Sequence, residues 1–192
     1  MNERALATID AVHQAVVDLI LEGGVPAVTL SAVCQRAGIS KGGLMHHFPS
    51  KEAMVGSFVD QACQGCLAEA HSTLAEINPG DGKRTAAFVD LMLRDPAMAS
   101  PKESRDLAAV MIAMMQGSAT QQAQHWYDTI YRELRGDGLA KPMIDLVISA
   151  IDGLWLQSMV LPTATMQTRA QQLRKQLKRV IKADVIRRAQ KV

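Results

Sequence analysis

The sequence predicts an all-α protein of about nine helices. No segment of the 192 residues shows the sustained two-residue alternation of apolar and polar side chains that is typical of a strand. Apolar residues instead recur every three to four positions, and glycine and proline divide them into segments of helix length. Apolar residues make up 48% of the chain and aromatic residues only 4%, so the core must be aliphatic and rich in methionine.

The first predicted helix runs from about Arg4 to Glu22. Its apolar residues fall on one face at the helical period, at Ile9, Val12, Val16 and Leu19. Gly23, Gly24 and Pro26 then end it. The segment is therefore expected to be an amphipathic helix that packs by one side.

Residues 29 to 49 predict two short helices joined by a tight turn. Thr29 is a good N-cap for the first helix, and Gly38 suits its C-terminus, where a positive φ is favoured. Ser40 can cap the second helix, and Pro49 stops it. The second helix turns Leu44 and Phe48 inward and presents Lys41, Gly42, Gly43, Met45 and His46 outward. This pattern predicts a helix-turn-helix, whose second helix enters the major groove of DNA.

The string Ala-Gly-Ile-Ser-Lys-Gly-Gly-Leu-Met-His-His-Phe-Pro-Ser-Lys-Glu, residues 37–52, closely resembles the N-terminal signature of tetracycline-repressor-type (TetR) transcription regulators. The resemblance covers about residues 5–60. Met45 stands where the family usually has a tyrosine that contacts a phosphate, and Gly43 stands where threonine is common. The resemblance therefore supports DNA binding more firmly than any one base contact. Together with the helix caps, it implies a DNA-binding set of Thr29, Ser40, Lys41, Gly42, Gly43, Met45, His46, His47 and Lys51.

Six more helices are expected after the helix-turn-helix. The fourth helix of the chain starts at about residue 50 and continues to about residue 77, because nothing interrupts it before Asn78-Pro79-Gly80-Asp81-Gly82. The others are expected at about 83–94, 102–116, 118–135, 141–160 and 166–190. We expect a DNA-binding domain at 1–50, a larger effector-binding and dimerisation domain at 51–192, and the fourth helix as the connection.

The last two helices predict a homodimer. Both are long and amphipathic, so they can bury one another or pair with their symmetry mates in a four-helix bundle. The segment 150–157, Ala-Ile-Asp-Gly-Leu-Trp-Leu-Gln, is also similar to the dimerisation helix of the TetR family, where Asp-Gly-Leu recurs. The residues expected at the dimer contact are Ile144, Ile148, Ile151, Leu173, Leu177 and Ile181.

The net charge of +2 is distributed unevenly. Residues 1–60 hold four Lys and Arg against six Asp and Glu, whereas residues 163–192 hold nine against one. An acidic N-terminal region counts against DNA binding, since phosphate neutralisation dominates affinity. Lys41 and Lys51 flank the recognition helix, and their positive charges favour DNA binding at this place. The basic tail is either the solvated face of a terminal helix or a second nucleic-acid contact.

No catalytic, metal-binding or cofactor-binding pattern is present. Cys63 and Cys66 share a helix face and could bind a metal or be oxidised together, but a tetrahedral site needs a second pair of ligands. The alternative is that both are small buried apolar residues. His46 and His47 are adjacent on a helix and point about 100° apart, so they cannot easily chelate one ion. The chain also lacks the nucleotide-binding and hydrolase motifs, so we expect no enzyme, no metal and no cofactor.

Eleven methionines, several of them in the middle helices, allow two interpretations. They are either ordinary core, or part of a pocket that accepts several ligand shapes, since methionine is flexible. The resemblance implies an effector pocket in the middle of the C-terminal domain. An apolar or amphipathic effector of unknown identity is then expected among Met111, Met114, Met115, Trp126, Tyr127, Trp155 and Met159.

Together these features predict a homodimeric, ligand-responsive transcriptional repressor that binds a palindromic DNA operator. The polar N-terminus has no signal-peptide pattern and the chain has no uninterrupted apolar run of about 18 residues, so we expect a cytoplasmic protein. Two rivals are a helical small-molecule sensor that has lost DNA binding, and an all-α enzyme. A test of DNA binding distinguishes the sensor from the repressor, and a screen for substrate turnover tests the enzyme.

Overall fold

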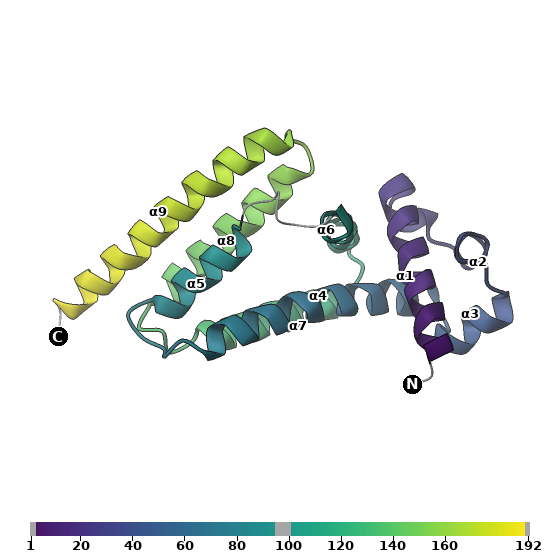
Figure 1. Ribbon diagram of the computed structural model, residues 1–192, viewed down its shortest axis with the longest axis horizontal. Helices are drawn as coiled ribbons and strands as arrows, with labels where there is room; N and C mark the ends of the chain where they lie inside the picture. Colours follow the sequence, from purple (N-terminus) through teal and green to yellow (C-terminus); the bar gives the residue numbers. More distant parts are fainter. Residues whose placement is uncertain (1–2, 95–100, 191–192) are drawn as a thin grey trace. The chain divides into compact units, whose positions relative to one another are not determined.

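The computed structural model describes residues 3–94 and 101–190. Within these ranges the chain forms nine α-helices, one short 3-10 helix (η1) and no strand (Figure 1), which confirms the all-α prediction. The elements are α1 Glu3–Gly23, η1 Val25–Ala27, α2 Leu30–Ala37, α3 Lys41–His47, α4 Lys51–Ala75, α5 Lys83–Met92, α6 Pro101–Met115, α7 Thr120–Leu134, α8 Lys141–Ser158 and α9 Thr163–Ala189. No described helix is both long enough and apolar enough to cross a membrane.

The helices pack as two compact units. The first unit takes the chain through Gly65 and adds Pro101–Trp126, so it contains α1 to α3, the first part of α4, α6 and the first part of α7. The second unit begins at Cys66 and resumes at Tyr127, so it contains α5, α8, α9 and the remaining parts of α4 and α7. This division by packing differs from the expected boundary at residue 50, because α6 packs against α1.

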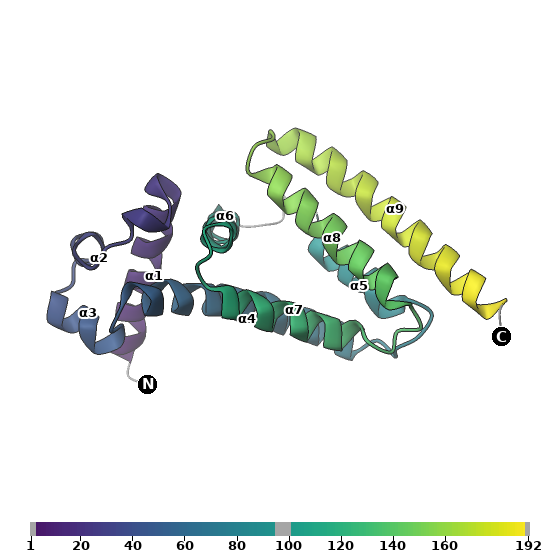
Figure 2. The ribbon, with the colours of Figure 1, turned by 180° about the vertical axis from the view of Figure 1, so that it is seen from behind.

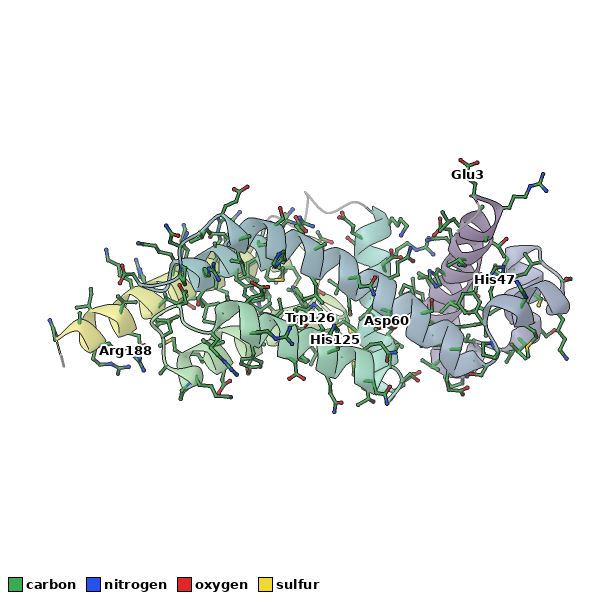
Figure 3. The ribbon with its side chains drawn as sticks, turned by 90° about the horizontal axis from the view of Figure 1, so that it is seen from below. Glu3, His47, Asp60, His125, Trp126 and Arg188 are labelled. Atoms are coloured by element: carbon green, nitrogen blue, oxygen red, sulfur yellow. The ribbon has the colours of Figure 1, made fainter. Side chains whose placement is uncertain are left out.

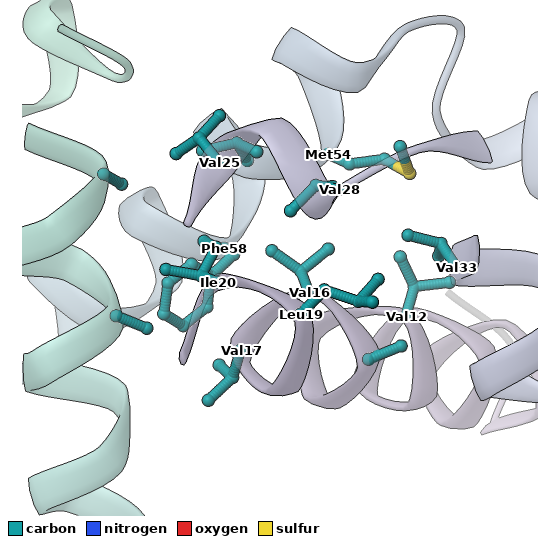
Figure 4. Packing of buried hydrophobic residues seen from close by; sticks show 14 of the residues in the cluster. Val12, Val16, Val17, Leu19, Ile20, Val25, Val28, Val33, Met54 and Phe58 are labelled. Atoms are coloured by element: carbon teal, nitrogen blue, oxygen red, sulfur yellow. The ribbon is translucent and has the colours of Figure 1, made fainter. Parts of the chain in front are cut away.

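The core of the first unit is built around α1. Val12, Val16 and Ile20 are at most 1% exposed and gather with Val33 of α2 and Phe58 of α4 (Figure 4). The predicted apolar face of the first helix is therefore its buried face. On α6, Ala109, Val110 and Ala113 belong to the same cluster, and this extends the core beyond the helix-turn-helix.

In the second unit, α8 and α9 lie side by side, and α5 packs against both (Figures 1 and 2). The buried side chains of α8 recur at the helical period, at Ile144, Val147, Ile148, Ile151 and Leu154. The matching buried residues of α9 are Met166, Ala170, Leu177 and Ile181. The apolar faces of these two helices are therefore used inside one protomer.

The start of α5 is capped by a side chain that lies more than 50 residues away in the sequence. Gly82, at the N-cap position, has no side chain, and the carboxylate of Asp137 from the α7–α8 loop takes that place. Its Oδ1 accepts from the backbone N–H of Gly80 at 2.9 Å and of Arg84 at 3.2 Å, and its Oδ2 accepts from the N–H and hydroxyl of Thr85, both at 2.8 Å. Asp137 and Thr85 are almost fully buried, so this cap fixes the α7–α8 loop onto α5.

The last helix starts at Thr163, three residues before the expected position. Pro162 has a φ of −58° and directly precedes the first helical residue. Proline is compatible with this position, because the first backbone N–H groups of a helix have no partner inside it. Pro162 is therefore the N-cap residue of α9.

Candidate functional site

Hydrogen bonds at the helix ends set the geometry of α2 and α3. The Thr29 hydroxyl accepts from the backbone N–H of Ala32 at 3.1 Å, and the Ser40 hydroxyl accepts from the N–H of Gly43 at 3.1 Å. Gly38 ends α2 with a φ of 68°. These are the caps predicted from the sequence, and they occupy the hydroxyl oxygens of Thr29 and Ser40. Contact with a DNA phosphate at these positions would therefore use backbone N–H groups or the hydroxyl protons.

The recognition helix α3 has one buried and one exposed side. Leu44 and Phe48 are 0% and 5% exposed and anchor the helix in the core of the first unit. On the other side, Met45 is 41% exposed. The other exposed members of the predicted set are Thr29, Ser40, Lys41, Gly42 and His46, while Gly43, His47 and Lys51 are half-buried. His47, at the end of α3, is labelled in Figure 3.

The first turn of α3 leaves space for an external group. A Cβ atom placed on Gly42 would meet nothing within 4 Å, so packing does not require glycine there. A Cβ atom on Gly43 would lie 3.3 Å from the capping oxygen of Ser40. The backbone at Gly42 is therefore open to close approach by a phosphate or a base edge.

Ion pairs and one amide hold the helix-turn-helix within its unit. Arg36 of α2 binds Glu22 of α1 through two hydrogen bonds of 2.8 and 2.9 Å and lies 3.6 Å from Asp18. Asp18 also binds Arg105 of α6. At the other end of α6, the side-chain oxygen of Gln116 accepts from the backbone N–H of Val25 at 2.7 Å. Sequence reasoning missed these contacts of α6 because their partners lie more than 85 positions apart.

His13 is a buried titratable group inside the same unit. It is 4% exposed, its Nδ1 lies 2.5 Å from the Gln61 side-chain oxygen, and its Nε2 lies 3.0 Å from the Ser57 hydroxyl. Because an amide oxygen only accepts, Nδ1 carries the proton and the Ser57 hydroxyl donates to Nε2. Burial lowers the pKa of His13, and the hydrogen bond to Gln61 only partly opposes this effect.

The lowered pKa of His13 predicts a loss of stability in acid. The unfolded chain takes up this proton as the pH falls below about 6.5, while the folded unit resists it, so the free energy of unfolding falls below that pH until the folded pKa is reached. Asp10 and Asp106 moderate the effect and Lys102 strengthens it. We expect the difference in urea midpoint between pH 7.5 and pH 5 to shrink in His13→Gln.

The exposed His125, labelled in Figure 3, provides the control for this measurement. The His125→Gln variant also loses one histidine, but this histidine is exposed. It should therefore keep the pH dependence of the wild type, whereas His13→Gln, which loses a buried histidine, should not. An equal pH dependence in the wild type and in His13→Gln would contradict the assignment.

The expected effector residues are divided between the two units. Met111, Met114, Met115 and Trp126 belong to the first unit, whereas Tyr127, Trp155 and Met159 belong to the second. Trp126 is 6% exposed and Met115 is 66% exposed. Within the first unit, a cleft of about 370 Å³ is lined by other residues, including Lys51, Val55, Gly117 and Gln122. None of the expected effector residues lines this cleft.

The expected dimer residues are mostly buried inside the protomer. Ile144, Ile148 and Ile151 of α8 are at most 6% exposed, Leu177 and Ile181 of α9 are at most 4% exposed, and Leu173 is half-buried. This burial inside the protomer differs from the expected contact with a second copy. An amphipathic period identifies a buried face but not the helix that covers it. A different set of α8 residues points away from the protomer core. We call this set the exposed face of α8, and it consists of Leu146, Ser149, Gly153 and Leu156, of which Gly153 is half-buried.

The sequence leaves two interpretations open for the cysteines and two for the basic C-terminal helix. Cys34, Cys63 and Cys66 are half-buried, and the described residues contain no group of three side chains suited to a metal ion. On α9, Arg174 and Lys178 bind Asp90 of α5 at 2.6 and 2.7 Å, and Arg187 and Arg188 bind the buried Asp184. Part of the basic tail is thus used for ion pairs within the second unit. Lys175, Arg179 and Lys182 are exposed.

Comparison with protein families agrees with the helix-turn-helix geometry. Residues 14–57 match the model described as bacterial regulatory proteins, tetR family, and residues 82–182 match the model of a tetracyclin repressor-like C-terminal domain. The second match alone spans more than half of the chain.

Individual relatives are more distant. Over 117 residues the chain is 26% identical to the HTH-type transcriptional regulator UidR of Escherichia coli K12, a match that spans 61% of this chain and 55% of that regulator. A solved TetR-family protein of Streptomyces coelicolor has a TM-score of 0.69 at 16% identity, with 93% of this chain and 98% of that one covered. The regulator FadR of Bacillus subtilis, solved in complex with stearoyl-CoA, has a TM-score of 0.67 at 13% identity, with 88% and 96% covered.

Proposed function

This chain belongs to the tetR family of bacterial regulatory proteins, and we propose that it represses transcription by binding a palindromic operator as a homodimer and releases it when a small molecule binds. The DNA-binding function is assigned to residues 1–50, with α4 as the connection to the effector-binding and dimerisation region 51–192. Members of this family regulate transcription, and catalysis has no part in the proposal.

The observation that carries this proposal is the arrangement of α3. Leu44 and Phe48 anchor the helix, and Ser40 caps its start. Its other side presents Lys41, Gly42, Met45 and His46. A helix held in this way can enter a major groove, and two copies related by a twofold axis would read half-sites about 34 Å apart. His47 and Lys51 are proposed to contact the DNA backbone at the edge of the same surface.

A gel-shift titration with the DNA upstream of the gene tests this function. We expect a specific complex that survives competition by a scrambled duplex of equal length, because outward side chains of α3 contact base edges. Equal affinity for both duplexes, or no complex at low salt, would contradict the repressor and favour the small-molecule sensor.

Lys51→Ala is expected to weaken binding to specific and scrambled DNA alike. Lys51 lies at the start of α4, next to the recognition helix, and loss of one phosphate contact lowers the slope of log K against log salt by about one unit. Lys175→Ala on α9 is the comparison variant and should leave the slope unchanged. A lower slope in Lys175→Ala would instead assign the basic tail to a second nucleic-acid contact, and an unchanged slope in Lys51→Ala would remove Lys51 from the interface.

The proposed dimer contact uses the exposed face of α8. Leu146 and Leu156 are 50% and 46% exposed, and they lie on one side of the helix together with Ser149 and Gly153. Large exposed apolar side chains in a row suit an isologous contact, in which the same face meets itself across a twofold axis. The small residues between them let two helices approach closely. This face replaces the six residues expected from periodicity.

The proposed effector is an apolar or amphipathic small molecule. The relative from Bacillus subtilis binds a ligand with a long acyl chain, which supports an amphipathic effector here. Of the residues expected from the sequence, those proposed to contact it are Tyr127, Trp155 and Met159, which belong to the second unit. If the effector lowers the affinity for DNA, linkage requires DNA to lower the affinity for the effector by the same factor.

A further inference from the structure

Two tyrosines of α7 bind two aspartates of α8 in the second unit. The Tyr131 hydroxyl donates to Asp145 Oδ1 at 2.7 Å, and the Tyr127 hydroxyl donates to Asp152 Oδ2 at 2.8 Å. The tyrosines are four residues apart and the aspartates seven, so each pair repeats on one face of its helix. The two sites are therefore built alike and can be compared directly.

A lysine completes the first pair. The Lys141 ammonium donates to both oxygens of Asp145, at 2.9 and 3.0 Å, and lies 5.1 Å from the centre of the Tyr131 ring. The hydrogen bonds from Lys141 and Tyr131 hold the pKa of Asp145 below its usual value. Burial, with Asp145 as its hydrogen-bond partner, raises the pKa of Tyr131 to about 12. This site thus combines a carboxylate, a phenol and a cation over an aromatic ring.

The second pair has no such cation. Burial raises the pKa of Asp152, and the only opposing contribution comes from the Tyr127 hydroxyl. No Lys, Arg or His of the described chain lies within ion-pair distance of this carboxylate. A half-buried carboxylate with a single neutral donor is costly, because desolvation disfavours its charged form. The two sites therefore differ in one respect, because Asp145 has a lysine partner, whereas the hydrogen-bond partner of Asp152 is a neutral hydroxyl.

Two aromatic residues of the second unit lie close to Asp152. Trp155 lies three residues after Asp152, so both side chains project from the same side of α8. Tyr127 contributes the phenol ring, and both aromatic residues are half-buried. Tryptophan and tyrosine rings attract organic cations through their faces.

We propose that Asp152, Tyr127 and Trp155 bind an organic cation, an ammonium group attached to an apolar body, in the place that Lys141 occupies beside Asp145. The inference rests on the proposed function only in assigning this cation as the effector. The site does not suit a metal ion, since calcium and magnesium need several oxygen ligands and Asp152 is the only carboxylate of this pair. The ammonium would neutralise Asp152, and the apolar body would contact Trp155.

Calorimetric titration with two small molecules tests the site. The probes are 4-phenylbutyltrimethylammonium and 4-phenylbutanol, which share the phenylbutyl body and differ in charge. We expect the wild type to bind the ammonium at least tenfold more tightly than the alcohol. Asp152→Asn should remove that preference and leave the affinity for the alcohol unchanged, while the matched variant Asp145→Asn should change neither affinity.

Thermal unfolding supplies a readout that needs no ligand. Asp152→Asn should raise Tm, because it removes an unneutralised charge while an amide oxygen can still accept from Tyr127. Asp145→Asn should lower Tm, because Lys141 loses its partner. The proposal is overturned if wild type does not bind the ammonium at millimolar concentration, if Asp152→Asn binds it as tightly as wild type, or if Asp152→Asn lowers Tm.

A gel shift in the presence of the ammonium separates the site from the proposed function. DNA binding without any affinity for the ammonium contradicts the cation site alone. Binding of the ammonium without release of DNA supports the site and removes its role as effector. A protein that binds the ammonium but no DNA supports the site and contradicts the repressor.

Discussion

The Asp137→Ala variant is expected to lose about 3 kcal/mol or more of unfolding free energy, because two buried and two half-buried donors lose their acceptor together. The carboxylate accepts four hydrogen bonds, from Gly80, Arg84 and twice from Thr85. A buried donor left without a partner costs about 1–3 kcal/mol, and water entering the space can recover part of that loss. Urea unfolding followed by circular dichroism measures the effect.

Asp128 provides the matched control for this experiment. It is an exposed aspartate on α7, nine residues before Asp137, and its replacement by alanine should change stability by less than about 0.5 kcal/mol. Hydrogen exchange adds a local test, since the amides of Arg84 and Thr85 should lose protection first in Asp137→Ala. Equal stability of the two variants would mean that the cap contributes nothing to the second unit.

We expect the Ile151→Asp variant to lose folding stability and the Leu156→Asp variant to lose self-association. Ile151 is 1% exposed in the protomer, so an aspartate there buries an unpaired charge, and we expect a loss of about 4 kcal/mol or more with unfolding of the second unit. Leu156 is 46% exposed, so the Leu156→Asp protomer should stay folded. Its self-association should weaken by about tenfold or more, since two copies of the charge would meet across the twofold axis.

Sedimentation velocity and thermal unfolding together separate these outcomes. Gln124→Asp, at an exposed position of α7, is the control and should change neither the dimer nor Tm. Leu156→Asp should sediment as a monomer at micromolar concentration with a Tm near that of the wild type, and its affinity for the operator should fall with the loss of the second half-site. A fully dimeric Leu156→Asp would move the dimer contact to another surface.

The sequence was sufficient for the features that depend on neighbouring residues. The caps at Thr29 and Ser40, the end of α2 at Gly38 and the buried pair Leu44 and Phe48 all follow from spacings of three or four residues, and the structure has each of them. Helix limits were predicted to within a few residues because glycine and proline interrupt the helical period.

The features that the sequence did not reveal depend on partners far along the chain. Nothing near Gly82 indicates that Asp137 caps α5, and nothing near Asp18 indicates Arg105. The same limit explains the correction at α8. Its strongest apolar stripe, which includes Ile151, packs inside the protomer, and the weaker stripe with Leu146 and Leu156 stays outside. Periodicity ranks the faces of a helix by hydrophobicity, but it does not say which neighbour each face meets.

The packing of α6 on α1 has a consequence for engineering hybrid regulators. A chimera that joins only residues 1–50 to a foreign sensor would lose Ala109, Val110 and Ala113 from the core around α1, and it would leave the backbone N–H of Val25 without the Gln116 oxygen. The unit that would have to be transferred with the helix-turn-helix therefore consists of two separate segments of the chain. A graft that keeps its operator preference must also carry residues 51–65 and 101–126, or supply helices of equal shape from the recipient.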